Sequence, residues 1–100
     1  MPASAHTFVS PLWEWPTTAA SWFFVNLSAE ASEIIRDMPR ETRAGFGSVR
    51  VEVMIGNTKW RTSIFPDSKA GVYILPVKKA VRTAESLEVG DTVEVTVAVL

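Results

Sequence analysis

The sequence predicts a mainly β fold, a small closed or nearly closed β-barrel of about six strands with two short peripheral helices. Three observations carry this prediction. Apolar and polar residues alternate through 49–55 and 58–64, on either side of a two-residue turn, which is typical of an antiparallel hairpin. Alternating valines in 92–99 predict the last strand. The segments 28–38 and 76–84 have the apolar spacing and the starting residues of helices.

The central hairpin is the best-defined part of the prediction. A two-residue loop with glycine first, at 56–57, favours a type II′ turn. This turn sets a register that pairs Val53 with Trp60 and Glu52 with Arg61. The apolar side chains then share one face, which we expect to point into the core. The Glu52–Arg61 pair adds a favourable contact between opposite charges on neighbouring strands.

Three further segments have the character of strands. The first covers 7–15, and Pro11, which donates no ladder hydrogen bond, favours an edge strand or a bulge there. The second covers 21–27 and contains four consecutive large apolar residues, 22–25. Such a run indicates burial on both faces, or one face turned to a ligand or partner. A short strand is expected at 72–75.

Both predicted helices have recognisable starts. Ser28 is placed as an N-cap before an apolar stripe formed by Ala31, Ile34, Ile35 and Met38. Pro76 is placed at the N-cap or the first position of the second helix. That helix should bury Val77, Ala80, Val81 and Ala84 and expose Lys78, Lys79 and Arg82.

Composition limits the chemistry that the chain supports. The 100 residues fit one domain, which we place at 7–100 after a disordered segment at 1–6. There is no cysteine and only one histidine, His6, so disulfides, thiolate chemistry, a histidine-based zinc site and a Ser-His-Asp triad are not expected. We find no catalytic constellation and no cofactor motif. The carboxylate pair Glu30 and Glu33 fits the first turns of a helix, where acidic side chains are favoured without any catalytic role.

The chain has no features of a secreted or membrane protein. The first residues carry no basic residue, and no apolar run approaches the ~18 residues that a membrane-spanning helix needs. We therefore expect a cytoplasmic protein.

Charge is unevenly distributed along the chain. All ten Lys and Arg residues lie between Arg36 and Arg82 with four acidic residues, so this block has a net charge of +6. The flanks carry the other seven acidic residues and no basic residue. This pattern arises from a mixed, solvated surface, or it marks a basic face for an anionic ligand. Our candidate ligand-binding cations are Arg43, Lys78, Lys79 and Arg82.

The tryptophans near the N-terminus form a second candidate site. Trp13 and Trp15 share a strand face just before a Pro-Thr-Thr loop, and 22–24 adds three more aromatic residues. These rings fill the barrel core, or they form an aromatic platform for a ligand.

Several motifs together resemble one known family. They are the strings at 22–27, 47–51, 55–66, 73–82 and 87–95, from Trp22-Phe23-Phe24-Val25-Asn26-Leu27 to Leu87-Glu88-Val89-Gly90-Asp91-Thr92-Val93-Glu94-Val95. In this order they resemble the bacterial domain-of-unknown-function family numbered nineteen-oh-five, over about residues 7–100. The resemblance implies a small closed β-barrel with peripheral helices. It implies no established activity and supplies no catalytic residue.

Three functions remain open at this point. The first is a non-enzymatic module, monomeric or homodimeric, that binds a small anionic molecule or a protein partner. The second is a nucleic-acid-associated barrel resembling transcription-factor or antitoxin domains, which the sequence pI of ≈ 5.8 disfavours. The third is an enzyme of unknown class. A concave pocket lined by Trp and Arg would favour ligand binding.

Overall fold

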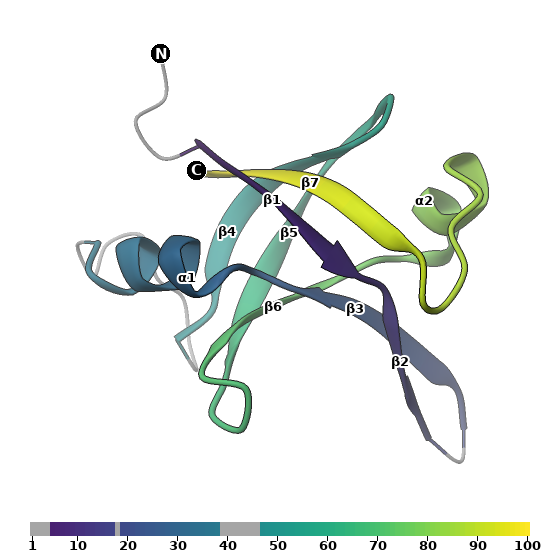
Figure 1. Ribbon diagram of the computed structural model, residues 1–100, viewed down its shortest axis with the longest axis horizontal. Helices are drawn as coiled ribbons and strands as arrows, with labels where there is room; N and C mark the ends of the chain where they lie inside the picture. Colours follow the sequence, from purple (N-terminus) through teal and green to yellow (C-terminus); the bar gives the residue numbers. More distant parts are fainter. Residues whose placement is uncertain (1–4, 18, 39–46) are drawn as a thin grey trace.

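The computed structural model describes residues 5–17, 19–38 and 47–100. Within them it has seven strands and two helices (Figure 1). In chain order these are β1 (Ala5–Pro11), β2 (Trp13–Pro16), β3 (Ser21–Asn26), α1 (Ala29–Arg36), β4 (Val49–Ile55), β5 (Thr58–Asp67), β6 (Val72–Pro76), α2 (Lys79–Ala84) and β7 (Thr92–Val99). The predicted mainly β class with two short helices is confirmed, and β1 begins two residues earlier than the expected strand at 7–15.

The strands form one curled antiparallel sheet in the order β1-β7-β4-β5-β6-β3-β2. The prediction of a closed or nearly closed barrel of about six strands is corrected in two respects, because the sheet has seven strands and forms an open half-barrel. The expected first strand divides at Leu12. Its first half, β1, pairs with β7, and its second half, β2, pairs with β3 at the opposite edge of the sheet. These two edge strands follow each other end to end and do not pair.

Leu12 is fixed where the chain passes from one edge to the other. Its N–H donates to the Asp91 carbonyl at 2.9 Å, and its carbonyl accepts from the Gly90 N–H at 2.8 Å. The side chain is buried. The turn before β7 therefore holds the junction between β1 and β2.

The predicted hairpin register is confirmed. Val53 pairs with Trp60, and Glu52 pairs with Arg61, whose Nε lies 3.7 Å from Glu52 Oε2. Gly56 has a φ of 58°, and Ser86 is the only non-glycine residue with positive φ in the described part of the chain. In this turn Gly56 has a positive φ and Asn57 does not, which fits the expected type II′ turn.

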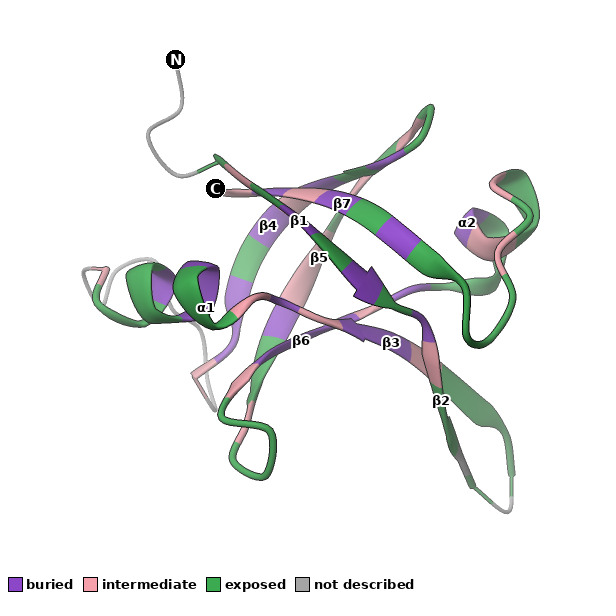
Figure 2. Ribbon diagram, in the orientation of Figure 1, coloured by how far each residue is buried: buried purple, intermediate pink, exposed green. Residues whose placement is uncertain are grey.

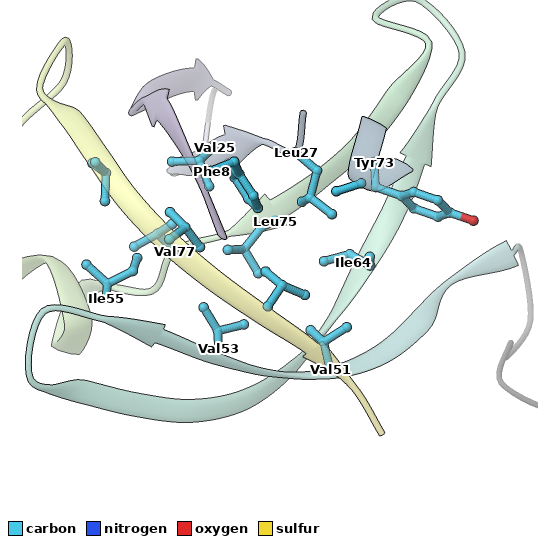
Figure 3. Packing of buried hydrophobic residues seen from close by; sticks show 14 of the residues in the cluster. Phe8, Val25, Leu27, Val51, Val53, Ile55, Ile64, Tyr73, Leu75 and Val77 are labelled. Atoms are coloured by element: carbon cyan, nitrogen blue, oxygen red, sulfur yellow. The ribbon is translucent and has the colours of Figure 1, made fainter. Parts of the chain in front are cut away.

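The core lies inside the curl of the sheet. Its side chains come from both arms, β4 and β7 on one side and β3 and β6 on the other, and point toward one another (Figure 3). Alternate residues of β4 and β7 supply a row of small β-branched side chains, Val49, Val51, Val53, Ile55, Val93, Val95 and Val97. β-branched side chains pack well on a pleated surface, so the valine-rich alternation sets which face of the sheet is buried.

The first helix packs on a polar contact as well as an apolar one. Ser28 caps it as predicted, because its Oγ accepts from the Ala31 N–H at 3.1 Å. Ile34 is exposed, so its place in the predicted apolar stripe is wrong. Ser32 is buried instead and accepts from the Tyr73 N–H at 3.0 Å, which fixes α1 to the start of β6.

The second helix begins later than expected. Pro76 ends β6 and the N-cap is Lys78, because the Val77 N–H donates to the Phe23 carbonyl at 2.8 Å and keeps the chain extended. Val77 and Val81 are buried as predicted, but Ala80 and Ala84 are exposed. Six residues make too short a helix to bury a longer stripe. In the described part of the chain, no helix has the length and apolarity to cross a membrane.

The end of α2 supports the β4–β5 turn. Glu85 Oε2 accepts from the Asn57 N–H at 3.3 Å and from Thr58 Oγ1 at 2.6 Å. A Cβ added at Gly56 would overlap the Glu85 carboxylate. The positive φ therefore favours glycine, and a side chain at this position would in addition displace the Glu85 carboxylate from the turn.

Gly56→Ala is expected to lower the free energy of unfolding by about 2–3 kcal/mol. A left-handed alanine costs about 1–2 kcal/mol, and the displaced carboxylate loses a hydrogen bond worth about 1 kcal/mol. Urea unfolding measures the loss. The matched control is Gly71→Ala. Gly71 has a φ of 72°, and no atom lies within 4 Å of the added Cβ, so this variant should lose only the free energy of placing alanine at positive φ. Equal losses at both sites would contradict a role for Glu85.

Ser32→Ala is expected to cost about 1–2 kcal/mol, because the buried Tyr73 N–H loses its acceptor. Native-state hydrogen exchange should show faster exchange at the Tyr73 amide. Ser68→Ala, in an exposed loop, serves as control and should cost less than about 0.5 kcal/mol. Unchanged protection of the Tyr73 amide would refute this contact.

Candidate functional site

A pocket opens where β6 leaves the sheet. β6 lies between β5 and β3 and pairs with them only at 65–67 and 24–26. Beyond these residues the chain departs through Val77 into α2, so β3 and β5 continue without a strand between them. The gap forms an open surface pocket of about 330 Å³ between β3, β5 and α2, which we call the basic pocket.

The basic pocket combines aromatic and cationic side chains. Three aromatic rings line it, from Trp22, Phe23 and Trp60. Four cations join them, from Arg61, Lys78, Lys79 and Arg82, and the rest of the wall is Ala20, Ser21, Thr62, Pro76 and Val77. None of these lining residues is acidic, so the pocket carries a positive potential that attracts anions.

Arg82 is held in place by two contacts. Its guanidinium carbon lies 3.7 Å from the centre of the Phe23 ring. Its Nε–H donates to the Val77 carbonyl at 3.1 Å. The two terminal nitrogens have no acceptor among the described residues. A half-buried guanidinium with a fixed plane and free N–H groups is suited to bind a carboxylate or phosphate.

The other three cations are less constrained. Arg61 shares its charge with Glu52 across the hairpin and remains largely exposed. Lys78 and Lys79 are exposed at the start of α2, and neither forms an ion pair within the described segments. Ammonium groups of this kind supply charge and adapt to the position of an anion without fixing its orientation.

Trp13 and Trp15 lie on a different surface, next to the basic pocket. Trp13 pairs with Phe24 and Trp15 with Trp22 across the β2–β3 hairpin, so all four share the face that points away from the core. Trp13 Nε1–H donates to Asn26 Oδ1 at 2.8 Å, and its ring stacks on Phe24 at 4.9 Å between ring centres. Trp15 and Trp22 are exposed and do not fill the core.

The structure brings together half of the residues that the sequence singled out. Lys78, Lys79 and Arg82 meet in the basic pocket, and Trp13 and Trp15 lie outside it. Arg43 falls outside the described residues. Sequence reasoning missed Trp60 as a pocket residue, because its place opposite Val53 assigned it to the core. It is in fact half-buried at the rim, where β6 no longer covers β5.

The arrangement provides recognition groups rather than metal ligands. Within residues 5–17, 19–38 and 47–100, no group of three or more His, Cys, Asp or Glu side chains could hold a metal ion. What the basic pocket offers is a fixed guanidinium, two free ammonium groups and indole rings. These groups bind an anion and a planar ring at neighbouring positions.

Comparison with known proteins gives a family. No curated protein matches the chain. A protein-family model matches residues 8–97, which is 90 of the 100 residues and includes every strand and both helices at least in part. The match agrees with the resemblance in the sequence motifs, and the chain therefore belongs to the family described as Domain of unknown function (DUF1905).

Proposed function

We propose that this domain is a binding module for a small anion that carries an aromatic ring, and that the ligand binds in the basic pocket. The observation that carries the proposal is the fixed Arg82 guanidinium, stacked on Phe23 and bonded to the Val77 carbonyl, in a pocket lined by three further cations and no carboxylate.

The anionic part of the ligand follows from Arg82. A guanidinium that is already oriented loses less side-chain entropy on binding than a free one, so each hydrogen bond it forms contributes more to affinity. Lys78 and Lys79 lie at the same pocket and add charge. Together the three cations fit one carboxylate or phosphate group, to which the Arg82 guanidinium can donate two parallel hydrogen bonds.

The aromatic part of the ligand follows from Trp22 and Trp60. Both residues line the pocket, and both keep part of their surface in water. A planar ring placed against them would bury apolar area and gain a stacking contact. The volume of about 330 Å³ is at the lower end of small-molecule pockets, which fits a ligand of one or two rings.

The proposal predicts that 1-naphthoate, a two-ring carboxylate, and AMP quench tryptophan fluorescence with dissociation constants on the order of 1 mM or below. Lys78→Ala/Lys79→Ala/Arg82→Ala should weaken binding at least about tenfold, because each charged hydrogen bond contributes about 1.5–3 kcal/mol. Arg82→Lys should also weaken it, since lysine keeps the charge but loses the fork.

A matched control removes the same charge elsewhere. Arg50→Ala/Lys59→Ala/Lys69→Ala takes three cations from outside the pocket and should leave affinity within about twofold at ~0.15 M salt, where exposed charges beyond ~8 Å are screened. If both triple variants weaken binding equally, the effect is one of net charge. If the wild-type protein binds neither ligand at millimolar concentration, the proposed function is wrong.

A further inference from the structure

The outward face of the β2–β3 hairpin carries a second feature that the basic pocket does not use. Trp15 and Trp22 are direct cross-strand partners there, with exposed fractions of 57% and 58%. Figure 2 shows the projecting end of this hairpin as exposed. Behind the two indoles, Phe24 is 8% exposed and packs against Trp13 and Trp15. The pair therefore stands on a supported aromatic base.

These indoles do little for the fold. The core cluster contains neither of them, although it draws on every strand except β2. They line a shallow apolar hollow of about 320 Å³ together with Thr17 and Phe24. Two adjacent exposed tryptophans on a rigid base present flat π-surfaces to solvent, which is the form of a stacking platform.

The platform and the basic pocket are continuous. Trp22 is a lining residue of both the apolar hollow and the basic pocket, so the hollow at Trp15 adjoins the pocket that holds Lys78, Lys79 and Arg82. Toward the other side, Trp13 and Trp15 border a groove with two carboxylates, Glu14 and Asp67, and one ammonium, Lys69. The cations thus lie at one end of the aromatic surface.

We propose that this surface binds single-stranded nucleic acid, with bases stacked on Trp15 and Trp22 and phosphates held by Lys78, Lys79 and Arg82. The inference rests on the proposed function, because the same basic pocket receives a phosphate of the strand. Aromatic stacking beside a cationic track is how proteins bind single strands without sequence preference. A duplex does not fit, since its base faces are covered by their neighbours.

The overall acidity of the chain does not oppose this binding. The pI of ≈ 5.8 describes the whole molecule, whereas exposed charges act over about 8 Å at physiological salt. None of the residues that line the basic pocket is acidic, and the one ion pair within the described segments, Arg61 with Glu52, leaves the charges of Lys78, Lys79 and Arg82 unpaired. With three phosphate contacts, log K should fall with log salt at a slope of about −2, from about −0.7 per contact on single strands.

The test uses a fluorescein-labelled oligo(dT) of about eight nucleotides, followed by anisotropy, with unlabelled dTMP titrated in parallel by tryptophan quenching. Wild type should bind the oligonucleotide more tightly than dTMP. Trp15→Ala should lower the affinity for the oligonucleotide about tenfold, equal to about 1.4 kcal/mol. The affinity for dTMP should not change, because Trp15 lies outside the basic pocket. Trp15→Phe should retain most of the affinity, since an aromatic ring remains.

Met54→Ala removes an exposed apolar side chain on β4 and is the control, with no expected effect on either ligand. Thermal melts confirm that each variant is folded. Oligonucleotide affinity no greater than that of dTMP, or unchanged in Trp15→Ala, overturns the inference while the proposed function stands. The inference is also overturned, and the proposed function stands, if sedimentation shows that the wild-type protein is a dimer and that Trp15→Ala is a monomer. A second copy of the chain would then cover the two indoles. Failure of both the oligonucleotide and dTMP to bind also overturns the inference, and the proposed function falls with it only if 1-naphthoate and AMP fail to bind as well.

Discussion

The hydrogen bond from the Val77 N–H to the Phe23 carbonyl organises this domain. It continues the contact of the β6 chain with β3 one residue past Pro76 and keeps the backbone extended through Val77, after which the chain leaves the sheet. Because of that departure, β3 and β5 separate, α2 begins beside the gap, and the Val77 carbonyl becomes available to Arg82. The basic pocket is thus a consequence of where one strand stops. Its walls come from residues that would otherwise be covered by a longer β6.

The parts of the fold that sequence predicts well are those governed by near neighbours. The register that joins Val53 to Trp60 follows from alternation and a two-residue turn, both local properties. The half-barrel depends on long-range choices. Nothing in the pattern around Leu12 shows that β1 and β2 pair with different strands, because that division is set by the distant turn at Gly90. The exposure of Ile34 and the burial of Ser32 also depend on a distant residue, since Ser32 accepts a hydrogen bond from the Tyr73 N–H.

In the candidate site, too, the features set by near neighbours could be predicted and those set by distant elements could not. Exposure of Lys78 and Lys79 follows from helical periodicity, and Arg82 falls on the same side. Their aromatic neighbours could not be assigned from sequence, because alternation gives the face of a strand but not whether another element covers that face. Trp60 points inward like Val53 and yet reaches the rim. Trp22 belongs to an apolar run that resembles a buried strand, but the hairpin of β2 and β3 projects beyond the body of the sheet (Figure 1).

The pairing of the first strand with the last has a consequence for synthesis on the ribosome. Ala5 lies opposite Ala98, so β1 has no partner until β7 has emerged. The hairpins β2–β3 and β4–β5 close over short loops and are free to form early, whereas β1 must wait. During that interval its apolar residues, Phe8 among them, are exposed to other chains. The time that synthesis takes to reach β7 after β1 has emerged therefore sets how long the nascent domain is vulnerable to aggregation.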